Sequence, residues 1–520
     1  MHIDNNHKIP IIKSALIITV IGIISRVLGL LREAVIAAVF GVGAVTDAYA
    51  VAVRTISTTG LVAFVYLTII FVPTYVRVRE DKGDTVALGV TNNSLGVSLT
   101  VNAFLMLVLW FVAPVFVGLT GFDEGQSDLA VTAVRIISFQ LPLMAFINLF
   151  IGYLNARKSF IGPAAIGLLM NVVFISVCII AGTASGIVGL SIAAVLGFVG
   201  QLCTLIYWLI KEKYRYKFSV RFNTPEIRND ILLLLPALLG GGLSDIKAWI
   251  DTIIATNLGI GAPAAINFSV RLLGFVTGLI VIPIAGIVYT YMSEHATKND
   301  IPKMLVTLWQ TVRVILFIVT PIVVIAMLFS FDVVNIVFER GEFTPEATIL
   351  TGTALMWLLP GLLGISIYTF LIRFFYALKD TKTPMLCSGV AIIVNIILSL
   401  WLSGIMGIGG LTLATSISGI FTAILLLIFL RHKIGALGFS KTAIDILKMA
   451  VCAIPCGLAA WGIGYLLAEH HAIIRFGVST IAGGGVYIIA AFLAKEMVLK
   501  EAIQMAKIRI TQKRTNNDEE

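Results

Sequence analysis

Long apolar runs separated by short polar breaks limit this chain to few possible folds. Examples are residues 97–117, 307–329 and 417–430. A helix needs about 20 apolar residues to cross the hydrocarbon core of a bilayer, and these runs reach or approach that length. Only 12% of the 520 residues are charged, against roughly 25% in soluble globular proteins. The sequence therefore predicts an all-α polytopic membrane protein.

Dividing the chain at its polar breaks gives about fourteen predicted transmembrane helices. The predicted spans are 12–40, 46–76, 87–117, 128–155, 160–182, 186–210, 229–258, 264–292, 304–330, 347–378, 384–404, 408–430, 443–468 and 473–497. The first apolar stretch runs from near Ile11 to Phe40, which is too long for the hydrophobic region of a cleaved signal peptide. We expect it to be a retained first span.

Positive charge alternates with loop position along the chain. Most Lys and Arg residues outside the spans lie in the loops that follow even-numbered spans, and two odd-numbered loops are acidic. Because cytoplasmic loops carry an excess of Lys and Arg, this pattern predicts a bacterial inner-membrane protein with both termini in the cytoplasm. The same bias accounts for the net charge of +9, so no nucleic-acid partner is expected. The basic, aromatic loop 211–228 is expected to lie on the anionic inner leaflet.

The chain resembles itself at one constant offset, the separation between Ala156 and Ala377. The residues Ala156, Lys158, Pro163, Gly186, Ile187, Gly189, Leu190 and Ala193 recur as Ala377, Lys379, Pro384, Gly407, Ile408, Gly410, Leu411 and Ala414. A second echo, at nearly the same offset, pairs residues 41–44 with 259–262. Spans 1–6 therefore correspond to spans 7–12. This predicts two pseudo-symmetric six-helix lobes, residues 1–225 and 226–435, followed by two further helices and a basic tail, residues 436–520.

Parallel repeats of this kind are found in transporters that bind substrate between the halves and alternate access to it. Nothing in the sequence resembles a nucleophile with a neighbouring base or a nucleotide-binding loop. The chain is therefore not expected to be an enzyme or, by itself, an ATP-driven pump.

Charged side chains occur inside several predicted spans. Each costs at least ~2.5–3.5 kcal/mol in the hydrocarbon, so each needs a functional or structural reason. They are Arg26 and Arg32 in the first span, Asp47 and Arg54 in the second, Arg135 in the fourth, Asp245, Lys247 and Asp251 in the seventh, Arg271 in the eighth and Arg373 in the tenth. Lys247 and Asp251, four residues apart, can pair on one helix face. Ion pairing or snorkelling also explains Arg135 and Arg373.

The cations of the first, second and eighth spans outnumber their obvious partners. Asp47 and Arg54, seven residues apart, share a helix face, but Arg26 and Arg271 have no such neighbour. An excess of cations around a cavity between two lobes predicts an anionic substrate. Arginine suits phosphate because its planar guanidinium donates two parallel hydrogen bonds and stays charged when buried. A lipid diphosphate fits this chemistry better than a cationic drug does.

Four segments carry more specific patterns. They are Ser25-Arg26-Val27-Leu28-Gly29-Leu30-Leu31-Arg32-Glu33 with Phe40-Gly41 and Thr46-Asp47-Ala48-Tyr49; Leu154-Asn155-Ala156-Arg157 with Pro163 and Asn171; Phe338-Glu339-Arg340-Gly341-Glu342-Phe343-Thr344; and Phe375-Tyr376-Ala377-Leu378-Lys379-Asp380-Thr381-Lys382-Thr383-Pro384. In this order they resemble the MurJ (MviN) family of lipid II flippases, in the multidrug/oligosaccharidyl-lipid/polysaccharide exporter superfamily. The resemblance covers nearly the whole chain.

The resemblance implies essential cavity residues at Arg26, Arg32, Asp47 and Arg271, with the arginines contacting the diphosphate and sugars. One position departs from the family pattern, because Gly60 stands at or near a place where the family commonly has an arginine in the second span. Arg54, earlier on the same helix, is the expected substitute. The departure keeps another undecaprenyl-linked glycan open as the substrate.

The resemblance also implies a sodium site between the seventh, eleventh and twelfth spans. Its ligands would be Asp251, Asn395 and Thr415, whose oxygens suit a hard cation. Ser399 stands where a carboxylate is expected, which predicts a weak site, and ordinary polar contacts between helices explain the same residues. A cycle driven by the membrane potential or by protons remains an alternative.

The leading hypothesis is a flippase that moves lipid II from the inner to the outer leaflet by alternating access. Its partners would be the lipid-linked anionic glycan, membrane lipids and proteins of cell-wall synthesis. The alternatives are a flippase for another undecaprenyl-linked oligosaccharide, a cation-coupled multidrug exporter and a non-transporting scaffold for cell-wall enzymes.

Overall fold

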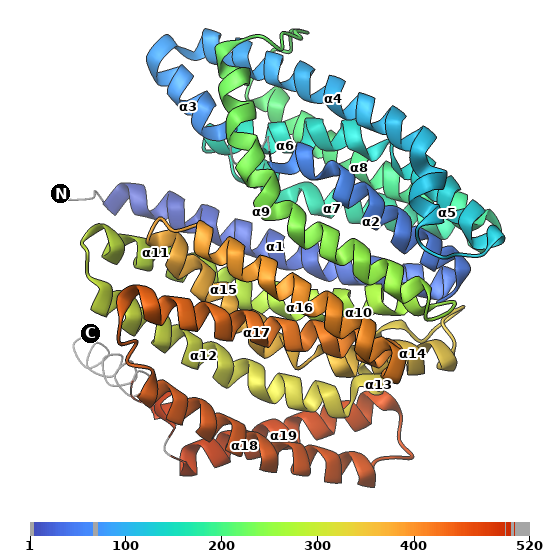
Figure 1. Cartoon of the computed structure of the whole chain (residues 1–520), viewed down its shortest axis with the longest axis vertical. Coiled ribbons are helices and arrows are strands. Elements are labelled where there is room, and N and C mark those ends of the chain that lie inside the picture. The colour runs from blue at the N-terminus through green and yellow to red at the C-terminus, as the bar shows by residue number, and fades with distance from the viewer. Residues whose placement is uncertain (1–4, 66–70, 495, 501–503, 505–520) are drawn as a thin grey trace, which may run out of the picture. The chain divides into compact units, whose positions relative to one another are not determined.

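The computed structural model describes residues 5–65, 71–494, 496–500 and 504 of the chain. These described residues form helices joined by turns and loops, with no strand among them (Figure 1). The α-helices are α1 (Asn5–Phe40), α2 (Ala44–Val65), α3 (Phe71–Lys82), α4 (Asp84–Gly118), α5 (Glu124–Ile137), α6 (Gln140–Ala156), α7 (Ile161–Ala181), α8 (Gly186–Lys211), α9 (Pro225–Thr256), α10 (Ala262–Val276), α11 (Ile282–Thr297), α12 (Ile301–Leu328), α13 (Ser330–Phe338), α14 (Pro345–Leu358), α15 (Gly361–Ala377), α16 (Lys382–Met406), α17 (Ile408–Ile434), α18 (Phe439–Leu466) and α19 (Ala472–Leu493). The all-α fold predicted from the apolar runs is confirmed.

The predicted spans correspond to these helices in order. Ten stretches of the described chain are long and apolar enough to cross a membrane, and the bent pair of α14 and α15 raises this to eleven. The three other predicted spans are the first, second and seventh, which correspond to α1, to α2 with α3, and to α9. Residues 66–70 of the second span lie outside the described residues.

The internal repeat is visible in the helix bounds and in the turns. α5 and α14 begin and end at positions related by the offset found in the sequence, and so do α6 and α15. Lys158 and Lys379, related by the same offset, both have a left-handed backbone, with φ of 63° and 59°. Gly186 and Gly407 form a second such pair, with φ of 51° and 57°. Positive φ is rare for residues other than glycine, so its recurrence at Lys158 and Lys379 supports a repeated backbone plan. The two pseudo-symmetric halves are confirmed.

Both repeats interrupt their fourth span at the same place. Ser138 and Phe139 separate α5 from α6, and Leu359 and Pro360 separate α14 from α15, where the axis bends by 44°. Proline cannot donate the backbone hydrogen bond that would continue the helix. In the first repeat, the Ser138 hydroxyl donates to the carbonyl of Arg135 at 2.7 Å and so competes for a helix acceptor. The predicted fourth and tenth spans are therefore each two helices.

Contacts divide the chain into two compact units. The first comprises Met1–Arg271 with Phe338–Ala347, and the second comprises Leu272–Val337 with Thr348–Glu520. α9 and the start of α10 thus group with the first repeat by contact. The predicted lobes 1–225 and 226–435 and the appended segment 436–520 are defined by the repeat rather than by contact, so that division stays a prediction.

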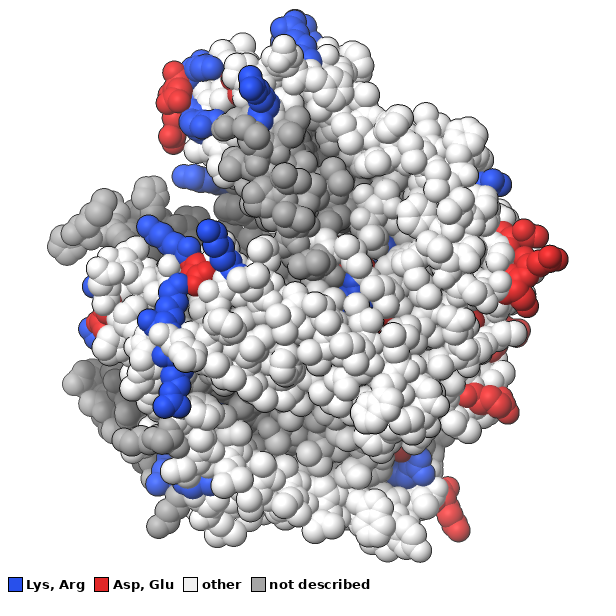
Figure 2. Space-filling model, in the orientation of Figure 1, with Lys and Arg blue, Asp and Glu red and all other residues white. Residues whose placement is uncertain are grey.

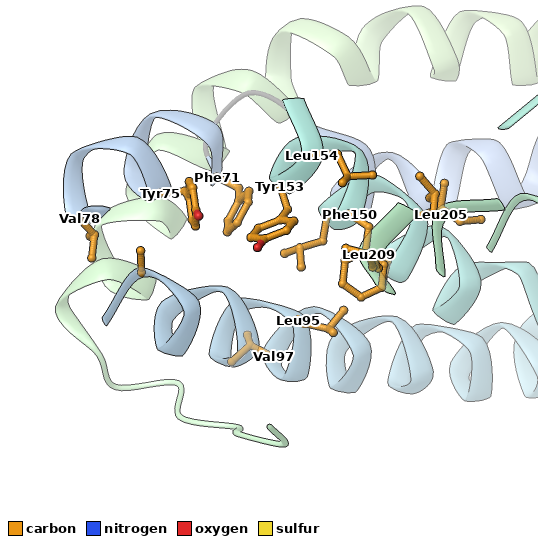
Figure 3. Close-up of a cluster of buried hydrophobic side chains, with 14 of the residues drawn as sticks. Phe71, Tyr75, Val78, Leu95, Val97, Phe150, Tyr153, Leu154, Leu205 and Leu209 are labelled. Carbon is orange, nitrogen blue, oxygen red and sulfur yellow. The ribbon is translucent and has the colours of Figure 1, made fainter. Parts of the chain in front are cut away.

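One end of the first unit has an aromatic core. Tyr75 and Tyr153 are fully buried, with ring centroids 5.5 Å apart, and Tyr153 lies 5.0 Å from the ring of Tyr214. Figure 3 shows Tyr75, Phe150 and Tyr153 projecting into the space beside α4. Edge-to-face contacts of this kind stabilise by about 0.5–1.5 kcal/mol beyond the area they bury. This core fixes the ends of α3, α4 and α6 together with the segment that follows α8.

The second unit has a smaller core where α12, α18 and α19 meet. It contains Phe329, Cys456 and Tyr487, and the ring of Phe317 lies 5.3 Å from that of Tyr487. An ion pair between Arg313 of α12 and Asp445 of α18, at 3.1 Å, closes one end of the same interface. The last two helices are therefore part of the second unit and pack against α12.

Candidate functional site

The five predicted substrate residues all lie in the first unit. Arg26 and Arg32 are on α1, Asp47 and Arg54 on α2, and Arg271 on α10. Their helices are the first two spans of the first repeat and the second span of the other. Whether any of the five contacts substrate stays a prediction, but the structure defines their surroundings.

A buried carboxylate joins two of these arginines. The Glu33 carboxylate is 2.7 Å from Arg32 Nη2 and 3.5 Å from Arg271 Nε. The side chain of Glu33 is only 6% exposed and that of Arg32 15%, whereas Arg271 is 45% exposed. One carboxylate therefore pairs with two guanidinium groups, so the three side chains together carry a net charge of +1. Arg271 is the most exposed of the three.

Glu33 was not predicted as a site residue, although it lies inside one of the signature segments. The available signal was a carboxylate directly after an arginine within an apolar span. A buried arginine needs a counter-charge, so its nearest carboxylate belongs to the same site. The excess of cations pointed to the arginines but not to the anion that two of them share.

Other side chains extend this cluster. The Arg32 guanidinium lies 5.3 Å from the ring centroid of Phe174, a cation–π contact from α7. Tyr49 of α2 is within electrostatic range of Arg32, Glu33 and Arg271. Arg54 is within the same range of Arg271 and also of the carboxylates of Asp245 and Asp251. Arg32, Glu33, Arg54 and Arg271 are thus brought together, which the sequence predicted for the arginines only.

Arg26 lies further along α1, where α7 crosses closely. The Asn171 amide donates to the carbonyl of Ser25 at 3.3 Å and to that of Gly167 at 2.7 Å. A methyl group on Gly167 would lie 2.0 Å from the Ser25 hydroxyl, so a larger residue would require the Ser25 side chain to move. Arg26 Nη1 is buried without a hydrogen-bond partner among the described residues. The structure does not bring Arg26 into contact with the Glu33 cluster.

Asp47 does not have the environment expected from its seven-residue spacing to Arg54 on the same helix face. Its carboxylate accepts hydrogen bonds from the backbone N–H of Gly261 at 2.5 Å and of Ala264 at 2.9 Å, and the residue is fully buried. A carboxylate at the first turn of a helix satisfies free N–H groups and complements the helix dipole. Asp47 therefore caps α10, the helix that carries Arg271, rather than pairing with Arg54.

Two signature segments meet at one end of α1. The Glu342 N–H donates to the carbonyl of Ala38 at 2.9 Å. A methyl group on Gly41 would lie 2.3 Å from the Glu342 carbonyl oxygen, and one on Gly341 would lie 2.2 Å from that of Ala38. Both glycines also have positive φ. Only glycine permits this contact between two backbones.

The predicted sodium ligands are divided between the units. Asp251 belongs to the first unit, where its Oδ2 is 2.5 Å from the Lys247 ammonium. In the second unit, the amide of Asn395 and the hydroxyl of Ser399 are fully buried without partners among the described residues. The Thr415 hydroxyl donates to the carbonyl of Leu411 at 3.5 Å. Asp251 Oδ1, like the Asn395 amide oxygen, is buried without a hydrogen-bond partner among the described residues, while Asp251 Oδ2 pairs with Lys247. Whether these residues bind sodium stays a prediction.

Ion pairs at the ends of the spans complete the electrostatic picture. Arg157, after α6, lies 2.9 Å from Asp84 and 3.6 Å from Glu212, and its guanidinium donates to the Tyr75 hydroxyl at 3.2 Å. Burial opposes its charge, but these hydrogen bonds raise the pKa of Arg157. After α15, Asp380 pairs with Lys433. Burial would raise the pKa of Asp380, but hydrogen bonds from Lys433 and Thr383 lower it to about 2.

Comparison with known proteins points to one family. A family model described as "Lipid II flippase MurJ" matches residues 36–478. "Probable lipid II flippase MurJ" of Treponema pallidum is 24% identical over 492 residues, 91% of this chain and 93% of the relative. "Lipid II flippase MurJ" of Burkholderia cenocepacia is 28% identical over 433 residues, 79% of this chain and 82% of the relative.

Solved structures agree on the fold. "Lipid II flippase MurJ, inward closed conformation" aligns with a TM-score of 0.78 at 22% identity, covering 93% of this chain and all of that one. A multidrug resistance MATE family transporter of the MOP superfamily, in an inward-facing conformation, aligns with a TM-score of 0.66 at 16% identity, covering 82% of this chain and 99% of that one. At these identities the likeness shows a shared fold, that of the superfamily expected from the sequence.

Proposed function

The chain belongs to the MurJ family of lipid II flippases, and we propose that it moves lipid II from the inner to the outer leaflet by alternating access. No covalent bond is made or broken in this step, so the protein acts as a carrier and not as an enzyme. The chain is a multi-pass protein of the inner membrane. Orientation with both termini in the cytoplasm and contact with proteins of cell-wall synthesis are part of the proposal.

The observation that carries the proposal is the shared use of Glu33 by Arg32 and Arg271. The buried Glu33 carboxylate holds both guanidinium groups in place, and the three side chains together keep a net charge of +1. A diphosphate can replace or extend the contact with Arg271, which is the most exposed member. Bidentate donation from guanidinium to phosphate then fixes the headgroup.

Asp47 acts in this proposal as a positioning residue. It holds the N-terminus of α10 through Gly261 and Ala264, and Arg271 lies further along the same helix. Release of that cap would let α10 move and carry Arg271 away from Arg32. In this proposal the cap is present in the conformation seen here and is released in the opposite-facing state, so that it biases the equilibrium between the two.

The membrane potential is the proposed driving force. Moving one elementary charge across 100 mV is worth about 2.3 kcal/mol, and an interior-negative potential favours outward movement of an anionic headgroup. Because Lys247 already neutralises Asp251, no step of the proposed cycle uses sodium.

The charge distribution of the first unit supports the proposed orientation. Figure 2 shows several Lys and Arg side chains, together with some Asp and Glu side chains, at the upper left, at the end of the unit where Figure 1 places α3. A group of Asp and Glu side chains lies at the right-hand edge, where Figure 1 places α5. Lys and Arg are thus frequent at the α3 end and the α5 end is acidic, which is what the positive-inside rule predicts if the α3 end faces the cytoplasm.

A depletion strain tests the function directly. The resident lipid II flippase is removed, and this gene is expressed in its place. We expect growth to be restored and lipid II to become accessible at the outer leaflet. Restored growth without leaflet transfer would indicate a scaffold instead. Failure of both, with the protein present in the membrane, would rule out lipid II as substrate and leave another undecaprenyl-linked glycan to be tested by the same transfer assay.

A further inference from the structure

The segment between α8 and α9 is irregular but firmly held on α4. The amide of Asn93 donates to the carbonyl of Arg221 at 2.9 Å, and its oxygen accepts from the Arg221 N–H at 2.7 Å. The Ser219 hydroxyl donates to the same oxygen at 3.2 Å. The preceding residue on α4, Asn92, accepts from the Tyr214 hydroxyl at 2.6 Å. Buried side-chain amides therefore replace the secondary structure that this segment lacks.

The fit of the segment against α4 is close. A methyl group on Gly96 would lie 1.9 Å from the carbonyl oxygen of Ser219, so the segment's backbone rests directly on the helix. The ring of Tyr214 lies 5.6 Å from that of Phe150 and 5.0 Å from that of Tyr153. Val220 packs against the same aromatic core. The segment is thus anchored at Tyr214 and again at residues 219–221.

Between and beside these anchors, the segment exposes aromatic and cationic side chains. Tyr216 is 50% exposed, Phe218 75% and Phe222 50%. The cations Arg215, Lys217 and Arg221 are exposed among them. Residues 211–224 contain five Lys and Arg and one Glu. These rings, which alternate with cations on a fixed backbone, leave half or more of their surface uncovered by the unit.

The end of α8 indicates the depth at which this surface begins. Tyr207 is 64% exposed and Ile210 71%, and the ring of Tyr207 lies 6.0 Å from that of Trp208. The Lys211 ammonium lies 4.7 Å from the Trp208 ring. Trp and Tyr gather where a span leaves the hydrocarbon, and lysines just beyond them reach toward headgroups. The segment therefore starts at the membrane surface.

We propose that residues 211–224 form a preorganised docking surface for anionic phospholipids. Phe218, Tyr216 and Phe222 insert among the headgroups, and Arg215, Lys217 and Arg221 bind lipid phosphates. The hydrogen bonds from Asn92 and Asn93 hold this surface in its binding form before lipid arrives, so little ordering is lost on docking. The inference does not depend on which molecule the carrier transports.

The test uses the full-length protein in nanodiscs of phosphatidylcholine, with or without phosphatidylglycerol. Phe218 is replaced by the photo-crosslinking amino acid p-benzoylphenylalanine, and lipid adducts are identified by mass spectrometry. We expect adducts at this position, with phosphatidylglycerol strongly preferred over phosphatidylcholine and the preference reduced at high salt. Adducts with both lipids in proportion to their abundance, or no lipid adducts at all, would overturn the proposal; crosslinks to an added acidic protein alone would do the same.

A charge-matched pair of variants separates docking from general charge. The triple variant R215Q/K217Q/R221Q should lower the apparent affinity for phosphatidylglycerol by about tenfold or more, since each cation near an anionic surface contributes appreciably. The control, R77Q/R79Q/K82Q, removes the same charge from exposed cations of α3 in the same unit. Equal losses in the two variants would contradict a specific surface.

A third variant tests preorganisation. Asn93→Ala removes the contacts to Ser219 and Arg221 while leaving every exposed cation and ring in place. We expect fewer phosphatidylglycerol adducts at position 218 than in the parent, in a protein that remains folded at the temperature of the experiment. An unchanged adduct yield would show that the segment docks without being held, and would overturn the preorganised form of the proposal.

Discussion

The first two spans of each repeat differ from the last two in what they bury. α1, α2, α9 and α10 carry Arg32, Glu33, Asp47, Asp251 and Arg271 within the apolar region. By contrast, residues 163–209 and 384–430, which cover almost all of α7 with α8 and of α16 with α17, contain no charged side chain. Both repeats show this division, so it belongs to the repeated plan rather than to one half.

The uncharged spans are held together by close backbone approach instead. In the second unit, a methyl group on Gly410 of α17 would lie 2.0 Å from the carbonyl oxygen of Leu402 in α16. In the first, one on Gly200 of α8 would lie 3.2 Å from the carbonyl oxygen of Leu169 in α7. Small residues are the common means of packing helices in lipid. The spans of the proposed site thus keep charge, whereas these four helices do not. Charge also occurs in other spans, as in the pair of Arg313 on α12 with Asp445 on α18.

The largest effect is expected from Glu33→Ala. Removal of the carboxylate leaves Arg32 and Arg271 without their shared partner, which costs about 3–5 kcal/mol for a buried pair. Thermal unfolding in detergent should therefore begin at a much lower temperature than in the parent. Glu124→Ala, at an exposed N-terminal turn of α5, is the control and should leave unfolding unchanged. Similar shifts in both variants would remove the special role of Glu33.

Arg271→Ala is expected to act on binding more than on folding. Its side chain is 45% exposed, so its loss should disturb stability little. A charge-assisted hydrogen bond contributes about 1.5–3 kcal/mol, which corresponds to roughly 10–100-fold in the affinity for lipid II. Binding in nanodiscs measures this. Arg135→Ala, which removes a cation lying over Trp110, is the control and should retain parental affinity.

Gly410→Ala should instead lower stability and leave the affinity for lipid II unchanged. The added methyl group has no room against Leu402, so the variant is expected to lose about 1–3 kcal/mol of stability. Gly404→Ala in α16, where the added group meets open space, should unfold as the parent does. Lipid II affinity of the folded fraction should be unchanged in both. A loss of affinity in Gly410→Ala without loss of stability would break the division between charged and uncharged spans.

A smaller effect is expected at the junctions that follow α6 and α15. Glu212 pairs with Arg157 in the first repeat. The corresponding residue of the second repeat is Lys433, which pairs with Asp380. The charge at this repeat position is therefore negative in one repeat and positive in the other. The Asp380 pKa of about 2 is below the value of about 3.9 for an unfolded chain. Its stabilisation is therefore complete above about pH 4 and is lost as the pH falls toward 2.

Asp380→Asn should abolish this dependence. At neutral pH it should cost under about 1 kcal/mol, because the Lys433 side chain is substantially exposed. The difference in unfolding temperature between the parent and the variant should narrow from pH 7 to pH 3 and close toward pH 2. A constant difference across that range would show that Asp380 is not the titrating group.

No effect is expected from replacing sodium. The Lys247 ammonium already neutralises Asp251, so exchange of sodium for choline should leave the leaflet transfer rate unchanged. Lys247→Met is the informative variant, because it removes the ammonium from the carboxylate. Sodium dependence in the parent protein would overturn the assignment of Lys247 as the resident counter-charge.

The fold could be predicted from the sequence to the level of spans and repeat, because apolar length and loop charge act locally. The breaks within the fourth and tenth spans were not predicted, since Ser138 and Pro360 lie inside otherwise continuous apolar stretches. The cap on α10 was also missed. Asp47 and Gly261 are 214 positions apart, and no spacing rule along one helix reveals a partner on another.

The candidate site was predicted only in part, because the sequence shows which residues are charged but not which helices meet. Arg32, Arg54 and Arg271 were identified from the cost of charge in the membrane, and the structure brings them near one another. The role of Glu33 could not be predicted, because one of its two arginine partners, Arg271, lies on α10, far away in the sequence. Arg26, selected by the same argument, stands apart from this cluster, so its role rests on the family resemblance.

Leaflet transfer of lipid II by the reconstituted protein is the sharpest test of the proposed site. Proteoliposomes are loaded with lipid II, and its exposure at the outer surface is followed over time for the parent, for Arg271→Ala and for the control Arg135→Ala. We expect transfer by the parent and the control and a rate at least roughly tenfold slower for Arg271→Ala. Equal rates for all three proteins would contradict the assignment of the Arg32–Glu33–Arg271 cluster as the lipid II site.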